Sequence, residues 1–171
     1  KNRVVIGLFL GLIFTLAPLL GRAQELTFSF RVSHNGETSA SHQFGLREDA
    51  MQGIDNYDVP EPPAAPDASF VSFLAMFNAP VSLPNRWRSD FRPTVSLLAD
   101  RVELWQFEFQ TDAIGGEATI TIDTLGAVPV PYELYFLGPG VYYEPIEVPD
   151  SFTFPVLSNK LVFFWELRLA D

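Results

Sequence analysis

The residues Trp105-Gln-Phe-Glu-Phe-Gln-Thr-Asp-Ala-Ile-Gly-Gly-Glu-Ala-Thr-Ile-Thr-Ile-Asp123 decide the fold. In the first half, aromatic residues at every second position alternate with polar ones, and in the second half Ile120 and Ile122 alternate with threonine. Strict alternation with a period of two is typical of a β-strand that buries one face. Gly115-Gly116 favours a tight turn between the two runs, because glycine adopts positive φ angles without strain. The stretch therefore predicts a β-hairpin with one apolar face, which the rest of the chain must cover.

Further strands are predicted on both sides of this hairpin. Alternating or apolar runs place them at 26–32, 38–46, 70–77, 132–137, 141–148, 151–156 and 161–169. About nine short strands without a convincing helix predict an all-β fold, an antiparallel β-sandwich of the Ig-like or jelly-roll kind, with a closed barrel as the alternative. Residues 47–69 and 80–93 are expected to be loops. The side chains expected to be buried together are Trp105, Phe107, Phe109, Ile120, Ile122, Phe163 and Trp165.

The first 23 residues have the layout of a secretory signal peptide. Lys1 and Arg3 precede an uncharged apolar run at 4–20, and Gly21-Arg22-Ala23 ends in a small residue. We expect cleavage after Ala23, one domain at 24–171, and a secreted or cell-surface location. A retained membrane anchor is the alternative, although the run is at the short limit for spanning a bilayer.

The composition excludes several classes of function. Without residues 1–23, eight Lys and Arg face 21 Asp and Glu, a formal net charge of −13. Such a charge disfavours binding to nucleic acid and to anionic lipid. Cysteine is absent, which excludes disulfides, a thiol nucleophile and a thiolate metal site. An exported domain without disulfides must be held together by its core, and an aromatic content of 14% makes such a core credible.

The segment Phe44-Gly-Leu-Arg-Glu-Asp-Ala-Met-Gln-Gly-Ile-Asp-Asn-Tyr-Asp-Val-Pro-Glu-Pro-Pro63 resembles a recurring segment of bacterial exported proteins. It is similar to the pattern FG…A(T)DG.D…D.P.PP of uncharacterised β-sandwich domains associated with type IX secretion. The later strands at 105–109, 119–123 and 161–169 follow the order found in those domains. Met51-Gln52 departs from the usual Thr-Asp pair, and the chain as given lacks the C-terminal sorting domain. The resemblance implies an extracellular β-sandwich and no established activity.

The acidic, proline-rich stretch at 47–69 is the best candidate for a metal site. Calcium binds several oxygens from carboxylates, amide side chains and backbone carbonyls. The candidate ligands are Asp49, Asp55, Asn56, Asp58 and Glu61. Their order is not that of an EF-hand, and a solvated acidic loop without a metal is the alternative.

Four aromatic residues suggest a second kind of site. Trp87, Phe91, Tyr142 and Tyr143 could form a platform on which sugars stack, as in carbohydrate-binding modules. The alternative is that Trp87 and Phe91 close one end of the sandwich beneath neighbouring arginines, because large aromatic side chains usually bury their surface.

A catalytic set is not evident. His34 and His42 are the only histidines, and we expect ordinary surface or strand residues, because nothing supplies a third metal ligand or completes a nucleophile–base pair. Paired carboxylates serve glycosidases, but Glu103, Glu108 and Glu117 have the spacing of a solvated strand face. An enzyme is therefore only the third hypothesis.

We expect an exported structural or interaction module that associates with other chains, copies of itself first. The strand at 25–33 contains no proline and only two charges, Glu25 and Arg31, so it could pair with another sheet edge. The net charge opposes contact between copies, so assembly should strengthen with salt. A carbohydrate-binding module is the alternative function. A monomer whose edges are covered by residues 47–69 is the alternative to assembly.

Overall fold

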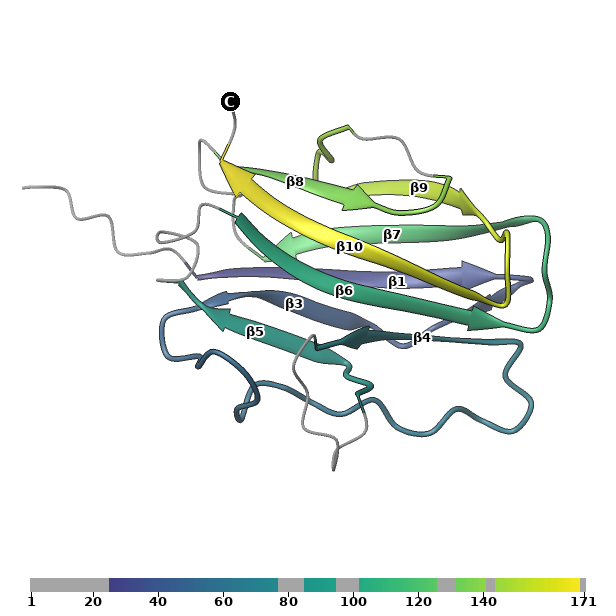
Figure 1. Cartoon of the computed structure of the whole chain (residues 1–171), viewed down its shortest axis with the longest axis horizontal. Helices are drawn as coiled ribbons and strands as arrows, with labels where there is room; N and C mark the ends of the chain where they lie inside the picture. The colour runs from purple at the N-terminus through teal and green to yellow at the C-terminus, as the bar shows by residue number, and fades with distance from the viewer. Residues whose placement is uncertain (1–24, 77–84, 95–101, 126–131, 141–143, 170–171) are drawn as a thin grey trace, which may run out of the picture.

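The computed structural model describes residues 25–76, 85–94, 102–125, 132–140 and 144–169. Within these ranges ten strands form two packed sheets (Figure 1). The strands are β1 (Leu26–His34), β2 (Glu37–Thr38), β3 (His42–Arg47), β4 (Phe70–Ala75), β5 (Ser89–Pro93), β6 (Val102–Thr111), β7 (Glu117–Leu125), β8 (Tyr132–Leu137), β9 (Asp150–Pro155) and β10 (Lys160–Leu169). Residues 1–23, the expected signal peptide, lie outside the described ranges. In the part that is described, no helix is long and apolar enough to cross a membrane.

The two sheets are the layers of a β-sandwich, as the sequence predicts. Sheet A has the order β5-β3-β1-β7-β9, with β2 also paired to β1, and sheet B has the order β4-β6-β10-β8. All pairs are antiparallel except β3 with β5. Figure 1 shows sheet B in front of sheet A, with β4 and β5 at one side and β8 and β9 at the other.

The core lies between the sheets and is mainly aromatic. All seven side chains expected there are fully buried or nearly so, which confirms the alternation argument. Phe107 of β6 meets Phe30 of β1 edge to face, with ring centroids 5.2 Å apart. Phe136 of β8 packs on Trp165 of β10 at 4.5 Å. Offset and edge-to-face ring pairs of this kind add to the stabilisation from burial alone.

The central stretch is not a hydrogen-bonded hairpin, so that prediction is wrong. β6 belongs to sheet B and β7 to sheet A, and the connection between them crosses from one layer to the other. A glycine of this connection bonds instead to the segment that follows β9: the Gly115 amide donates to the Val156 carbonyl at 2.8 Å. The apolar faces of both strands still point at one core, which is why the burial prediction holds.

β1 has neighbours on both sides. It pairs with β3 through residues 26–30 and with β7 through residues 27–33. The prediction that this strand offers a free edge is therefore wrong. β7 is distant in sequence, and no local pattern in β1 signals that it will pair there.

Both sides of the sandwich are closed by segments that change sheets. On one side, Trp87 exchanges two backbone hydrogen bonds with Leu74 of β4, and Ser89 then begins β5 in the other sheet. On the other side, the Ile146 amide donates to the Leu134 carbonyl of β8 at 2.8 Å before the chain enters β9. Strands that switch sheets are a known way of making sandwich corners. The expected loop at 80–93 thus contains a strand, whereas residues 144–148 of the expected strand at 141–148 contain only a bridge.

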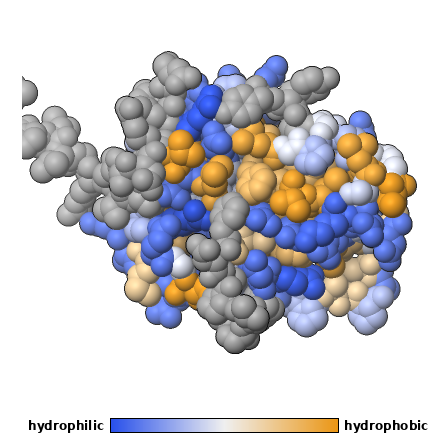
Figure 2. All heavy atoms as spheres, in the orientation of Figure 1, coloured by the Kyte–Doolittle hydropathy of each residue, from blue (hydrophilic) through white to orange (hydrophobic). Residues whose placement is uncertain are grey.

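The outer faces of the two sheets differ. Sheet A presents serine and threonine from β1, β7 and β9, whereas sheet B, the face seen in Figure 2, presents half-buried apolar residues among polar ones. Leu104 and Val162 are two such residues of sheet B. This is why β10 reads as a nearly continuous apolar run in the sequence.

Candidate functional site

The acidic stretch covers the outer edge of β5. The amides of Arg88 and Ser89 donate to the Val59 carbonyl at 2.7 and 3.3 Å. The Phe91 amide donates to the Asp58 carboxylate at 3.0 Å. Backbone donors that another strand could use are therefore already satisfied on this side of sheet A.

The four carboxylates among the candidate calcium ligands have separate partners within the protein. Asp55 accepts two amides of its own loop, Asp49 accepts the Tyr57 hydroxyl, and Glu61 forms a two-point pair with Arg88. Asn56 is exposed. Among the residues described, no group of three or more His, Cys, Asp or Glu side chains could hold a metal ion. Calcium binding stays a prediction, and the geometry gives these carboxylates a role in shaping the loop.

Asp55→Ala is expected to lower the free energy of unfolding by about 1–2 kcal/mol, because two amides lose their acceptor. In the wild type the Asp55 carboxylate accepts the amides of Met51 and Tyr57, each at 2.7 Å. Urea unfolding measures the loss, with the exposed Asp67→Ala as the control variant. Repeating the urea unfolding with a chelator separates loop shaping from calcium binding. Calcium binding would be shown by a chelator that destabilises the wild type and has no effect on Asp55→Ala.

Two members of the expected aromatic platform are inside the protein. Trp87 is 3% and Phe91 5% exposed. Trp87 is buried because it pairs with β4, and Phe91 because it sits on β5 beneath the acidic stretch. Burial of both rings agrees with the other interpretation, in which Trp87 and Phe91 shield the core, and contradicts a sugar platform formed by these two rings. Tyr142 and Tyr143 lie outside the described residues.

Both histidines are strand residues, one of the two places expected for them, but both are buried rather than at the surface. His34 is 2% exposed, and its ring nitrogens lie 3.1 and 3.3 Å from the carbonyl oxygens of Glu117 and Ala113. His42 is 1% exposed and belongs to a polar group between the sheets. Each histidine side chain points inward, on the same face of its strand as the buried apolar residues. The alternation of 42, 44 and 46 in β3 could have signalled this for His42.

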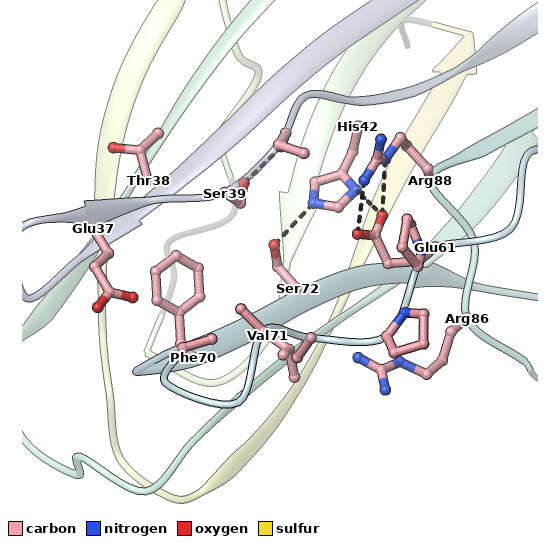
Figure 3. Close-up of a pocket in the computed structure, with 16 residues that line it drawn as sticks. Glu37, Thr38, Ser39, His42, Glu61, Phe70, Val71, Ser72, Arg86 and Arg88 are labelled. Carbon is pink, nitrogen blue, oxygen red and sulfur yellow. Dashed lines mark hydrogen bonds and ion pairs between the residues drawn. The ribbon is translucent and has the colours of Figure 1, made fainter.

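A hollow of about 220 Å³ lies beside β4, and His42 forms part of its wall (Figure 3). The Ser72 hydroxyl is 2.8 Å from His42 Nε2. His42 Nδ1 is 3.8 Å from Glu61, and Glu61 in turn holds Arg88 at 3.1 Å. The contacts thus run from Ser72 of sheet B to His42 of sheet A, and from His42 to Glu61 of the acidic stretch. Glu61 in turn pairs with Arg88.

This group has the order of a nucleophile–base–acid set, but its electrostatics oppose that use. Burial, followed by the nearby Arg88 charge, lowers the pKa of His42 from 6.5 to about 4, which makes the imidazole a weak base. The Glu61 carboxylate is neutralised by Arg88, so it gives little support to an imidazolium. The arrangement instead ties the two sheets to the acidic stretch. No local sequence pattern places Ser72 next to His42, which is 30 residues away.

His42→Gln and Asp58→Asn are expected to change the pH dependence of stability in opposite directions. The folded pKa of His42 is depressed, so between pH 6.5 and 4 the unfolded state binds the proton more readily and His42 makes stability rise with pH. Burial, the largest cause, raises the pKa of Asp58 from 3.8 to about 6, so this group makes stability fall with pH across that window. The free energy of unfolding of His42→Gln minus that of wild type should therefore fall as pH rises from 4 to 6.5. The same difference for Asp58→Asn should rise. Urea unfolding at both ends of the window checks the signs, and equal slopes in all three proteins would contradict them.

Two of the glutamates expected on a solvated face are buried. Glu103 is 4% exposed and lies 3.0 Å from Arg92, and Glu108 is 8% exposed and lies 2.7 Å from Lys160. Glu103 is inward because it shares the face of Trp105 on β6. Glu117 is exposed, as expected.

A larger hollow of about 390 Å³ lies at the opposite side of the sandwich, between β8 and β9. We call it the β9 hollow. The apolar residues that line it include Phe136, Phe152 and Ile146, which we call its floor. The exposed acids that line it are Glu117, Glu144 and Asp150, which we call its rim; Glu117 lies opposite Pro155 at one end of β9, and Asp150 is at the other end. All three acids are exposed, and no ion pair joins them to any cation in the described chain. Among the described residues that line the hollow, none is basic.

The β9 hollow adjoins an unpaired strand edge. β9 is the last strand of sheet A in the described chain, and β7 pairs with it on one side only (Figure 1). Just after β9, the Val156 amide donates to the carbonyl of Gly116, the residue before β7, at 3.1 Å, so it points toward β7. Since backbone groups alternate between the two sides of an antiparallel strand, those of Ser151 and Thr153 point away from β7. The Ser151 amide is taken by the Asp150 carboxylate at 2.7 Å, so the Thr153 amide is the donor that this edge offers.

Comparison of the chain with protein-family models, with curated proteins and with solved structures finds no match. The resemblance to exported bacterial β-sandwich domains therefore stays a prediction. Function has to be argued from the geometry of the chain itself.

Proposed function

We propose that this chain is an interaction module that adds an extended segment of another protein to the free edge of β9. The observation that supports the proposal is the position of the Thr153 amide and carbonyl, which face outward beside the aromatic floor of the β9 hollow. Strand addition uses such an arrangement: backbone hydrogen bonds give affinity, and a pocket for alternate side chains gives selectivity.

The other edges are less suited to strand addition. The acidic stretch covers β5, and Trp87 pairs with Leu74 on β4. Residues 62–65 line the hollow beside the rest of β4. On β8 the Ile146 amide already bonds to Leu134. β9 has an acidic residue at its start and a proline at its end, but its middle carries neither a charge nor a proline.

A second copy of the chain is a poorer occupant than a different protein. Two β9 edges would bring the same three rim carboxylates of both copies close together, Glu117, Glu144 and Asp150. Added salt screens this repulsion, because the Debye length is only about 10 Å at moderate ionic strength and shortens as salt is added. We therefore expect self-association, the first expectation from the sequence, only at high salt.

Thr153→Pro is expected to weaken binding of an extended peptide by about tenfold, because proline removes the outward amide and leaves the β7 side intact. The probe is a short synthetic peptide of alternating threonine and valine, blocked at both ends and labelled for fluorescence anisotropy. Thr153→Val is the matched control, since it keeps the amide and the shape of the side chain. A peptide methylated on alternate amides should also fail to bind. Equal affinities for wild type, Thr153→Pro and Thr153→Val would contradict strand addition at β9.

A further inference from the structure

We infer that the β9 hollow receives a cationic side chain with an apolar stem, that of lysine or arginine, from the added segment. This inference rests on the proposed function, because the segment that pairs with Thr153 is what carries the side chain into the hollow. The partner is then an extended segment in which a basic residue is flanked by residues that can adopt a strand.

The floor of the β9 hollow fits the stem. Phe136 is 1% exposed and packs on Phe152, with ring centroids 5.2 Å apart, and Ile146 is half-buried beside them. An aliphatic chain laid on the half-buried Phe152 and Ile146 would remove apolar surface from water, and the buried Phe136 ring supports Phe152 from inside the sandwich. The half-buried ring of Phe152 also offers a face to a cation.

The rim of the hollow fits the charge. Glu117, Glu144 and Asp150 come from β7, from the segment that crosses between the sheets, and from β9, so three separate elements each contribute one exposed acid to the lining of the hollow. Long basic side chains bury their stem on apolar surface and keep the charged group in water at the rim. The same carboxylates repel acidic side chains, so the rim selects against an acidic segment as well as for a basic one.

A copy of this chain cannot supply the required side chain by pairing β9 with β9. The sequence of β9, Asp-Ser-Phe-Thr-Phe-Pro, contains no lysine or arginine. β9 of a second copy is therefore excluded as the source, and we assign the hollow to a different chain because the rim acids of two copies would also repel each other.

The test uses the whole chain and small probes that need no strand pairing. n-Butylammonium and n-butylguanidinium represent the two side chains, n-butanol is their uncharged analogue, and n-butyrate is the anionic one. The isoleucine methyl spectrum reports binding through Ile146. Both cations should shift the Ile146 signal saturably, and butanol and butyrate should bind about tenfold more weakly or not at all. Butanol binding as tightly as the cations, or cations leaving Ile146 unshifted, would overturn the inference.

Variants of the rim test the charge without removing the floor. A Glu144→Gln and Asp150→Asn double variant should weaken cation binding about tenfold and leave butanol binding unchanged. Asn at 150 keeps an oxygen for the Ser151 amide, so the edge of β9 should stay as it is. Asp67→Asn, at an exposed carboxylate outside the hollow, is the matched control and should change nothing.

Failure of the inference and failure of strand addition are distinguishable. Thr153→Pro should weaken peptide binding about tenfold and leave the response of Ile146 to n-butylammonium unchanged, which supports the inference. The threonine–valine peptide should bind more tightly when its central valine is replaced by lysine. If both peptides bind equally and the cations do not bind, the inference is overturned while strand addition stands.

Discussion

Replacing Gly45 by alanine is expected to destabilise the protein by about 3 kcal/mol or more. Gly45 lies in the middle of β3, between β1 and β5. A Cβ at this position would lie 1.9 Å from the carbonyl oxygen of Leu26 and 3.1 Å from the Cα of Thr27. These are backbone atoms of β1, so they cannot yield without disturbing the pairing of β1 with β3 and β7.

Gly36→Ala is the matched control for this prediction. Gly36 has a φ of 81° in the turn after β1, and no atom lies within 4 Å of a Cβ built there. Its substitution should cost only the strain of a left-handed conformation, about 1–2 kcal/mol. Urea unfolding of the two variants measures the difference. Equal losses would mean that close approach of the β1 backbone is not what requires glycine at position 45.

Phe107→Ala is expected to cost about 3–5 kcal/mol, because truncation of a fully buried ring leaves a cavity that the surrounding side chains fill only in part. Phe107 is 0% exposed. Its ring centroid lies 5.2 Å from that of Phe30 in the opposite sheet and 5.9 Å from that of Phe163 on the neighbouring strand. Its loss therefore affects both layers.

The control for Phe107→Ala lies one residue along the same strand. Gln106 is half-buried on the opposite face of β6, so Gln106→Ala should cost less than about 1 kcal/mol. Chemical unfolding measures both variants. A loss under about 1 kcal/mol for Phe107→Ala would mean that the other face of β6 is inward.

Strand positions and core faces were predictable because both depend on local alternation. The side chains of β6 and β7 point inward whether the two strands pair in one sheet or face each other from two sheets. Alternation therefore predicted the burial of Phe107 and Ile122 correctly and could not distinguish a hairpin from a crossing between layers. That choice is made by long-range pairing, of β6 with β10 and of β7 with β1.

Long-range pairing also explains the two largest errors. β1 looked like an open edge because its second neighbour, β7, comes from a distant part of the chain. Residues 85–93 looked like a loop because arginine and proline dominate the local pattern, yet Trp87 pairs with Leu74, and β5 then pairs in parallel with β3. Parallel pairing between strands with a long connection leaves no local signal.

The candidate site was not predictable for the same reason. Glu117, Glu144 and Asp150 are ordinary exposed acids when each is considered alone, and only the packing of β8 against β9 brings them to one opening. The acidic stretch, in contrast, was conspicuous in the sequence, and its carboxylates are used by the fold itself, on amides of the loop and of β5.

Amide hydrogen exchange reports directly on pairing of β9 with an extended segment through Thr153. The wild-type chain is compared with and without a saturating amount of the lysine-containing threonine–valine peptide. Exchange of the Thr153 amide should slow by about tenfold or more on binding, because a free edge donor becomes a ladder hydrogen bond. Exchange of the Phe70 and Ser72 amides on β4 should not change. If the bound peptide leaves Thr153 exchange unchanged, or protects β4 instead, strand addition at β9 does not occur.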